Sequence, residues 1–171
     1  MLSFKDYSIT ESFSEEQKLP RIYCDMDGVI ADFLKGSKEI IGKEFNDDLW
    51  DQLPLDLYAN LPKMPDADKL WNFISKYDLY ILTAYPSAKR GKISKTSQGD
   101  KVKWMKKTFN FPSNKIHLVL RKEKQDYAKE GTLLIDDMIK NVKEFEAKGG
   151  IGIHHTSAAS TINQLKKIGF K

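Results

Sequence analysis

Short apolar runs recur along the chain, each rich in branched residues and each bounded by polar residues or glycine. There are five of them, at residues 21–24, 81–82, 116–120, 133–135 and 151–153. Runs of this length and composition are typical of strands that are buried on both faces, as in parallel sheets. The pattern therefore predicts five short, buried strands.

Helical periodicity fills the intervals between these runs. Apolar residues recur at spacings of three and four in residues 67–76, 100–109, 138–147 and 158–168. Asp66 stands where the first of these helices begins, and we expect it to be the N-cap. Strands that alternate with helices indicate an α/β fold. We predict a three-layer, Rossmann-like domain with a parallel sheet covered by helices on both faces.

One segment, residues 36–65, breaks this alternation. Its thirty residues are long for a loop within a compact domain. Its aromatic and leucine content argues against disorder. We interpret the segment as a small, mainly helical cap inserted after the first strand. Residues 1–20 are expected to form a peripheral arm, and residues 21–171 the core domain.

Composition sets broad limits on the class of protein. The 171 residues suit one compact domain, and no apolar stretch approaches the length of a membrane span. The single cysteine, Cys24, has no partner for an internal disulfide. We therefore expect a cytoplasmic protein with no membrane partner. The net charge of +4 fits attraction of a phosphorylated substrate, but solubility explains it equally well.

Polar residues of chemical interest follow the predicted strands directly. Asp25 and Asp27 follow the first strand, Thr83 follows the second, and Asp136 and Asp137 follow the fourth. The carboxyl ends of parallel strands form the ligand site of such sheets. Four carboxylates at one mouth need a cation to offset their repulsion, and oxygen ligands suit Mg²⁺.

The chain lacks a histidine and cysteine spacing that would hold zinc. His154 and His155 are adjacent, so on a strand their side chains would face opposite ways. We interpret both as structural or surface residues.

Four motifs carry a resemblance to a known family. DMDGVIADF at residues 25–33, a strand ending in Thr83, KVKW at residues 101–104 and LIDD at residues 134–137 resemble the haloacid dehalogenase superfamily. The closer similarity is to the 5'(3')-deoxyribonucleotidase family, whose pattern Arg121 also fits. The second motif departs from it, because TAYPS places alanine where that family has serine.

The resemblance implies a role for each catalytic residue. Asp25 would be the nucleophile, and Asp27 the general acid and base. Thr83 would hold phosphoryl oxygens, and Lys101 would neutralise developing charge. Lys103 is the rival for this lysine role.

The resemblance also implies a magnesium site and a phosphate-binding turn. The ligands would be Asp25, the Asp27 carbonyl, and either Asp136 or Asp137, with the choice between the last two left open. Gly28 would allow the sharp turn and close approach of phosphate. The backbone N–H of Ala84 would bind a phosphoryl oxygen.

Aromatic residues are candidates for binding a nucleobase. In the resembled family an aromatic at the position of Phe33 lines the base pocket. Trp50 and Tyr58 are weaker candidates, and any of the three could instead be a core residue. Arg121 could be a surface charge, or a contact to phosphate or base.

These observations predict a phosphomonoester hydrolase, with a deoxyribonucleoside 5'- or 3'-monophosphate as the best substrate. A second possibility keeps the chemistry but uses a sugar phosphate or a nucleic-acid 3'-phosphate. A third is a silent module that binds nucleic acid through its lysines. Four carboxylates at one mouth argue against that third possibility, and no stable nucleic-acid partner is expected.

Two features stay open in the sequence. The basic segment 86–100 could be a lid over phosphate or a solvated loop. The oligomeric state is also undetermined, with a homodimer among the options.

Overall fold

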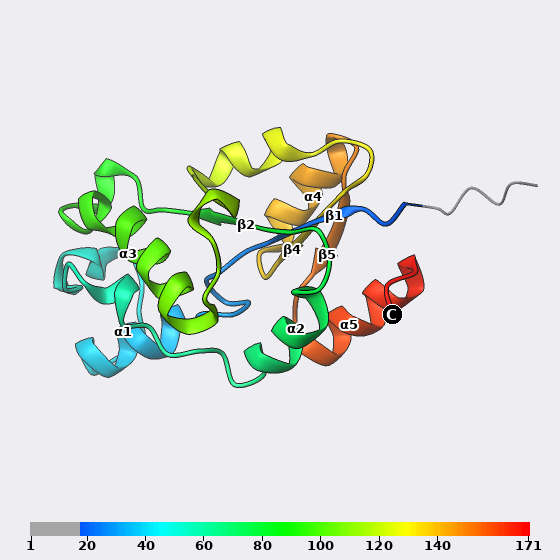
Figure 1. Ribbon diagram of the computed structural model, residues 1–171. Helices are drawn as coiled ribbons and strands as arrows, with labels where there is room; N and C mark the ends of the chain where they lie inside the picture. The colour runs from blue at the N-terminus through cyan, green and yellow to red at the C-terminus, as the bar shows by residue number, and fades with distance from the viewer. Residues whose placement is uncertain (1–17) are drawn as a thin grey trace, which may run out of the picture.

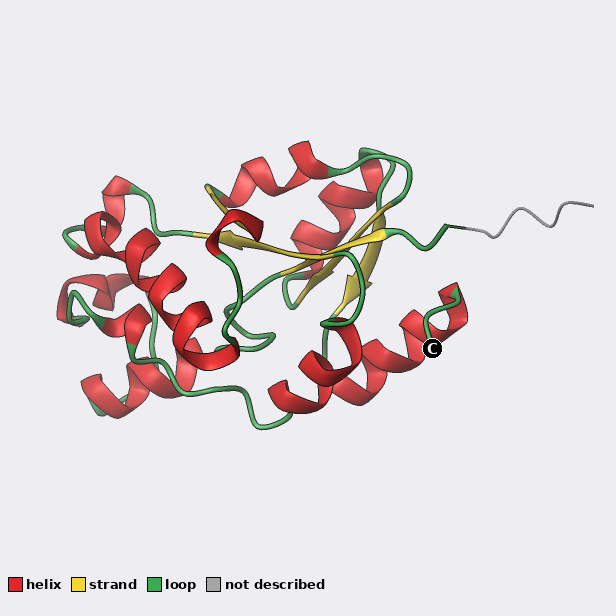
Figure 2. Cartoon of the chain, viewed as in Figure 1, coloured by secondary structure: helices red, strands yellow, loops and turns green. Residues whose placement is uncertain are grey.

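The computed structural model describes residues 18–171, and its centre is a five-stranded, wholly parallel sheet between two layers of helices (Figures 1 and 2). This confirms the predicted α/β class. The strand order is β3-β2-β1-β4-β5. The strands are β1 (Arg21–Cys24), β2 (Leu79–Ala84), β3 (Ile116–Val119), β4 (Thr132–Asp136) and β5 (Ile151–His154).

The central strand β1 pairs with β2 on one side and with β4 on the other. In the register, Cys24 faces Ile81 of β2 and Ile135 of β4. The chain first builds outward from β1 through β2 to β3, and then returns to add β4 and β5 on the opposite side. The carboxyl ends of β1 and β4 therefore meet at the switch point of the sheet, where ligands bind in folds of this kind.

Successive residues of β1 face opposite layers. Ile22 packs into the core between the sheet and the layer of α2 (Ala67–Ile74) and α5 (Ala158–Ile168). Tyr23 packs into a second core on the other face, with Phe145 of α4 (Ile139–Ala147). The 3-10 helix η5 (Arg121–Tyr127) lies on the same face as α4 (Figure 1). Two-sided burial explains why the strands read as continuous apolar runs.

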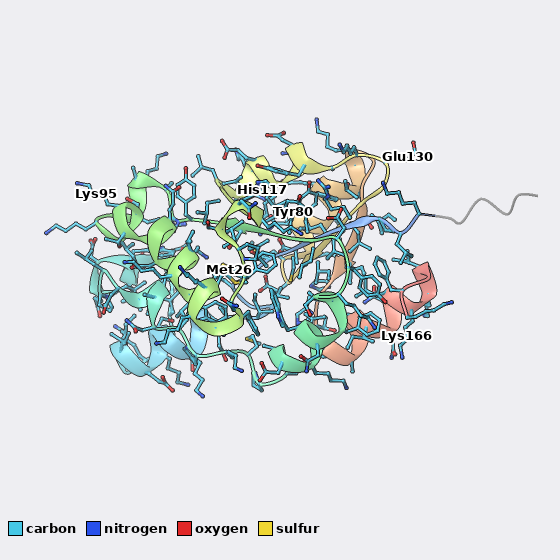
Figure 3. The ribbon with its side chains drawn as sticks, viewed as in Figure 1. Met26, Tyr80, Lys95, His117, Glu130 and Lys166 are labelled. Carbon is cyan, nitrogen blue, oxygen red and sulfur yellow. The ribbon has the colours of Figure 1, made fainter. Side chains whose placement is uncertain are left out.

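Side chains divide sharply between this interior and the surface (Figure 3). Met26 is fully buried among the elements, whereas Lys95, Glu130 and Lys166 are exposed. None of the helices in residues 18–171 combines the length and the apolar character needed to cross a bilayer.

The segment after β1 forms α1 (Phe33–Ile41), η1 (Asp47–Gln52) and η2 (Leu57–Ala59), which lie beyond the carboxyl ends of the strands (Figure 1). Helix α1 begins three residues before the predicted insert, because Asp32 caps it with a 3.0 Å hydrogen bond from the Lys35 N–H. The segment is tied to the body by Trp104, whose indole N–H donates to the Leu61 carbonyl at 2.7 Å.

Two local features differ in part from expectation. The basic segment 86–100 is not an extended loop: after a short 3-10 turn, η3 (Ala88–Arg90), helix α3 (Ile93–Phe109) occupies most of it. Asp66 is the N-cap residue of α2, as predicted, but its side chain makes no capping hydrogen bond there. Its carboxylate accepts the Ala158 N–H at 2.6 Å, at the start of α5. Another 3-10 turn, η4 (Ser113–Lys115), precedes β3. The predicted arm at residues 1–20 lies almost wholly outside the described residues.

Candidate active site

The loop after β1 turns sharply and brings two carboxylates to the switch point. The Asp25 N–H donates to the Ile135 carbonyl at 2.9 Å, so Asp25 extends the pairing of β1 with β4. The Met26 carbonyl then accepts N–H groups of Ile30 and Ala31, both at 2.9 Å. This closed turn leaves the side chains of Asp25 and Asp27 at the wall of one cavity.

The backbone conformation at position 28 and the nearby Asp137 side chain both require glycine there. The φ of Gly28 is 79°, a conformation that favours glycine. A Cβ at this position would lie 2.1 Å from an Asp137 carboxylate oxygen. Glycine therefore allows the turn after β1 and the turn after β4 to touch.

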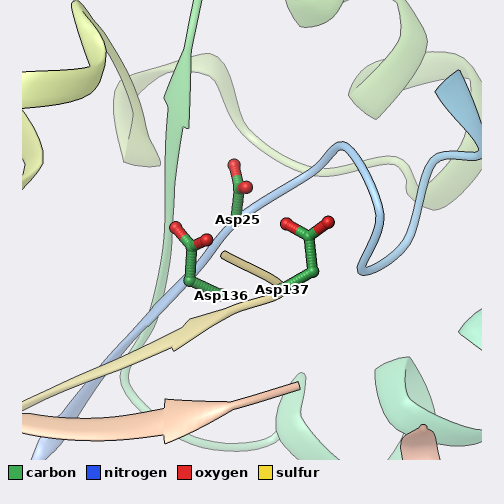
Figure 4. A group of neighbouring side chains, drawn as sticks. All are labelled: Asp25, Asp136 and Asp137. Atoms are coloured by element: carbon green, nitrogen blue, oxygen red, sulfur yellow. The ribbon is translucent and has the colours of Figure 1, made fainter. Parts of the chain in front are cut away.

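Three aspartates converge where these turns meet (Figure 4). Asp25 follows β1, Asp136 ends β4, and Asp137 follows it. One carboxylate oxygen of each lies within 4.8 Å of those of the other two. Asp25 and Asp136 are buried and Asp137 is half-buried. Such a set of oxygen donors suits a hard divalent cation such as Mg²⁺.

Lys124 lies within this cluster and was missed by the sequence analysis. Its Nζ is 2.9 Å from Asp25 Oδ1 and 2.7 Å from Asp136 Oδ2. Burial alone would lower the pKa of this ammonium, but the charges of Asp25 and Asp136 raise the pKa above its ordinary value. Lys124 therefore stays protonated and offsets part of the repulsion between the carboxylates.

Asp136 and Asp137 have different surroundings. Asp136 accepts four hydrogen bonds, from Lys124 (2.7 Å), the Met138 N–H (2.8 Å) and twice from the Asn141 amide (3.0 and 3.1 Å). Asp137 borders the cavity. Burial, followed by the charges of Asp25 and Asp136, raises the pKa of Asp137 to about 7. Asp137 is thus the more available ligand.

A second buried lysine joins the other carboxylate. Lys101 Nζ donates to Asp27 Oδ2 at 2.6 Å and to Thr83 Oγ1 at 3.1 Å. Its side chain is fully buried, whereas that of its sequence rival Lys103 is 74% exposed and pairs with Asp100. The structure therefore brings Lys101, and not Lys103, to the candidate site.

Asp27 has the features of a proton carrier. Its Oδ1 atom is buried and has no hydrogen-bond partner among residues 18–171. Burial raises the pKa of Asp27, the Lys101 charge opposes this, and the Asp25 charge adds to it; the net change is an increase. A raised pKa favours the protonated form of the carboxyl group, which is the form that a general acid needs.

The cavity in front of these groups has a volume of about 400 Å³ and two kinds of wall. The charged and polar lining residues together are called here the polar wall, and the apolar lining residues the apolar wall. Leu34 and Met138 at its edge are 63% and 47% exposed. The polar wall includes Asp25, Asp27, Asp137, Arg121, Lys124 and Asn141, and the apolar wall includes Phe33, Leu34, Met64, Ala84 and Met138.

Arg121 is held rigidly at the polar wall. Its Nη1 donates to Asn141 Oδ1 at 2.9 Å and to Glu144 Oε2 at 2.8 Å. The predicted substrate residue Arg121 therefore does lie at the cavity, anchored on α4.

The predicted aromatic residues divide into one at the cavity and two behind it. Phe33 lines the cavity. Tyr58 stacks on Phe33 with ring centroids 5.8 Å apart, and Trp50 packs at the same centroid distance at a steeper angle. Trp50 and Tyr58 are not part of the described cavity wall. Their direct contact with a substrate stays a prediction, and their packing supports Phe33.

Comparison with known proteins adds no family assignment. Neither the protein-family models nor the curated proteins compared with the chain include a match.

Proposed function

We propose that the protein is a Mg²⁺-dependent phosphomonoester hydrolase that forms a phosphoryl intermediate on Asp25, in the manner of the haloacid dehalogenase superfamily that its motifs resemble. One observation carries this proposal. Asp25, Asp136 and Asp137, from two neighbouring strand ends, place carboxylate oxygens within 4.8 Å of one another, and Asp25 and Asp137 line a cavity. Buried like charges of this kind are costly to stability and are typical of functional sites.

The proposed ligands of Mg²⁺ are the carboxylates of Asp25 and Asp137 and the backbone carbonyl of Asp27. Asp136 is assigned a supporting role, because its four hydrogen bonds already use both of its oxygens. The bound ion would supply positive charge to the phosphoryl oxygens of the substrate. The orphaned Asp27 Oδ1 atom supports a site that receives a further group.

In the first half of the reaction, a carboxylate oxygen of Asp25 attacks phosphorus and forms a new P–O bond. The bond from phosphorus to the leaving-group oxygen breaks, and that oxygen takes a proton from Asp27. The raised pKa of Asp27 suits it to carry this proton.

In the second half, Asp27 accepts a proton from a water molecule whose oxygen attacks phosphorus. The P–O bond to Asp25 then breaks, which releases inorganic phosphate and restores the Asp25 carboxylate. The covalent intermediate on Asp25 divides a difficult displacement into two easier ones, and Asp27 serves as the acid in the first and as the base in the second.

The two lysines provide fixed positive charge beside the reacting groups. Lys124 orients Asp25 through the 2.9 Å ion pair. Lys101, held by Asp27 and Thr83, is positioned to neutralise charge on the transferring group. Charges that are already in place before the reaction require no rearrangement as the transition state forms.

The apolar wall favours a substrate whose leaving group has a flat, weakly polar surface. Phe33 and Met64 on that wall could pack against a nucleobase, whereas a sugar phosphate would leave them without an apolar partner. We therefore propose a nucleoside monophosphate as the preferred substrate.

A phosphate-release assay with purified protein tests the proposal. We expect Mg²⁺-dependent release from nucleoside monophosphates, and slower release from sugar phosphates and 3'-phosphorylated oligonucleotides. Asp25→Asn is expected to lower turnover by at least about 10³-fold while the protein remains folded, since the nucleophile is lost. Turnover by Asp25→Asn at the wild-type rate would contradict the proposed intermediate. Absence of release by the wild type from every ester would contradict the function.

A further inference from the structure

The turn that carries Asp136 and Asp137 is anchored by the end of the neighbouring strand β5. In the sheet register Asp136 lies opposite His154. The His155 N–H donates to the Asp136 carbonyl at 2.8 Å. The His154 side chain contacts the next carbonyl along the chain. Its Nε2 atom lies 2.9 Å from the Asp137 carbonyl oxygen. The consecutive carbonyls of Asp136 and Asp137 are thus both bonded to residues at the end of β5.

The chemistry of this contact fixes its direction. A carbonyl oxygen only accepts hydrogen bonds, so the Nε2 atom of His154 carries the proton and donates it. From the sequence His154 is expected to be a structural or surface residue, because it and His155 would face opposite ways on a strand and would not chelate one ion together. A histidine that donates to a backbone carbonyl can instead act on a metal site through the residue that it holds.

Asp137 needs such an anchor more than its neighbours do. Asp136 is fixed by four hydrogen bonds, and Asp25 by Lys124 and by its backbone bond to Ile135. The Asp137 carboxylate is repelled by both of these groups. Its position is therefore set chiefly by its backbone, and His154 holds the carbonyl of that same residue.

We propose that His154 is a positioning residue for the cation site: it holds the Asp137 peptide so that the Asp137 carboxylate stays beside Asp25. This inference rests on the Mg²⁺ site of the proposed function. Partners that orient metal ligands through hydrogen bonds commonly contribute strongly to metal affinity.

Calorimetric titration of the purified full chain with MgCl₂, without substrate, tests the role directly. His154→Phe keeps a ring but loses the N–H donor, and we expect about tenfold weaker Mg²⁺ binding. His154→Gln retains an amide N–H at a similar reach, and its affinity is expected to stay within about threefold of the wild type. His154→Met also lacks a donor and is flexible, so it provides the same test if His154→Phe fails to fold.

A matched control and an activity measurement separate positioning from general destabilisation. His117 on β3 packs with Tyr80 and is absent from the cavity wall, so His117→Phe is expected to leave Mg²⁺ affinity unchanged. In the phosphatase assay, saturating Mg²⁺ is expected to return the kcat of His154→Phe to within about twofold of the wild type.

Three outcomes would overturn the inference. Wild-type Mg²⁺ affinity in both donor-free variants would show that the His154 contact is irrelevant to the site. Equal weakening in His154→Gln and His154→Phe would remove the hydrogen bond as its cause. A wild type that binds no Mg²⁺ would overturn the proposed metal site itself, and this inference with it.

Discussion

Two regions beside the cavity differ in composition: one is made of charged side chains and the other of aromatic side chains. The polar floor consists of Asp25, Asp27, Asp136, Lys101 and Lys124. Lys124 pairs with Asp25 and Asp136, Lys101 pairs with Asp27, and all but Asp27 are buried. The aromatic layer consists of Phe33, Phe45, Trp50 and Tyr58, which contact one another through their rings. Burial of charge opposes folding, whereas burial of aromatic surface favours it. Stability therefore does not explain why the charges of the polar floor are buried.

We therefore expect the polar floor to carry out the chemistry and the aromatic layer to shape the cavity. In the floor, each charge is held by at least one opposite charge, so a substitution changes both protonation and electrostatic balance. In the aromatic layer, Phe33 is the member that reaches the cavity, and the others support it. Substitutions in the floor should mainly affect turnover, and those in the layer should mainly affect stability and KM.

Lys124→Met should produce the largest combined effect. The substitution leaves Asp25 and Asp136 without their shared cation, so we expect turnover to fall by at least about 10³-fold. Loss of one partner from a buried ion pair also lowers the free energy of unfolding, by about 3 kcal/mol. Phosphate release and urea unfolding measure the two effects. Wild-type turnover in a folded Lys124→Met protein would contradict the role assigned to the floor.

Lys101 and Lys103 provide a matched pair on one helix. Lys101→Met is expected to lower kcat by about 10²-fold, because a buried charge beside Asp27 and Thr83 is lost. Lys103→Met is expected to keep kcat within about twofold, since a side chain that is largely exposed contributes little. The comparison requires only steady-state kinetics, and equal kcat values for the two variants would remove Lys101 from the site.

Asp137→Asn should stabilise the metal-free protein, in a pH-dependent way. Burial and neighbouring charge raise the folded-state pKa of Asp137 from 3.8 to about 7. As pH rises between these values the unfolded chain loses this proton while the folded protein keeps it, so folding stability falls. The gain from asparagine should therefore be small at pH 4 and reach about 4 kcal/mol above pH 7. Urea unfolding in EDTA measures it, and a gain that does not change with pH would contradict the assignment.

Phe33→Leu should have the smallest effect on chemistry. It removes the flat face from the apolar wall but leaves the floor intact, so KM for a nucleoside monophosphate is expected to rise about tenfold with kcat little changed. Phe73→Leu, away from the cavity wall, is the control for general loss of aromatic packing. A drop in kcat without a change in KM would argue that Phe33 shapes the floor and not the substrate pocket.

Much of the fold and part of the site could be predicted, because they depend on local pattern. Short runs of branched apolar residues predict buried parallel strands. The carboxyl ends of such strands meet at one edge of the sheet, which brings together Asp25, Asp136 and Asp137. Lys124 could not be found in this way. It lies in the charged run RKEKQ, and only the turn of η5 directs it, and not Lys122, into the cluster.

Other features depend on contacts between distant segments. The first turns of α3 lack apolar periodicity, and they are held by tertiary contacts such as the bond from Thr96 to the Leu55 carbonyl. Asp66 caps a helix that begins 92 positions later in the chain. His154 likewise contacts a distant segment, because its partner Asp137 lies in the turn after β4.

A crystal structure with Mg²⁺ and beryllofluoride, a mimic of a phosphoryl group bound to a carboxylate, would show whether Asp25 and the cation act together on phosphate. We expect a cation between the carboxylates of Asp25 and Asp137, with beryllium bonded to an Asp25 oxygen and Lys124 still paired with Asp136. A cation or beryllofluoride bound elsewhere, with the cavity in front of Asp25 empty, would contradict this expectation.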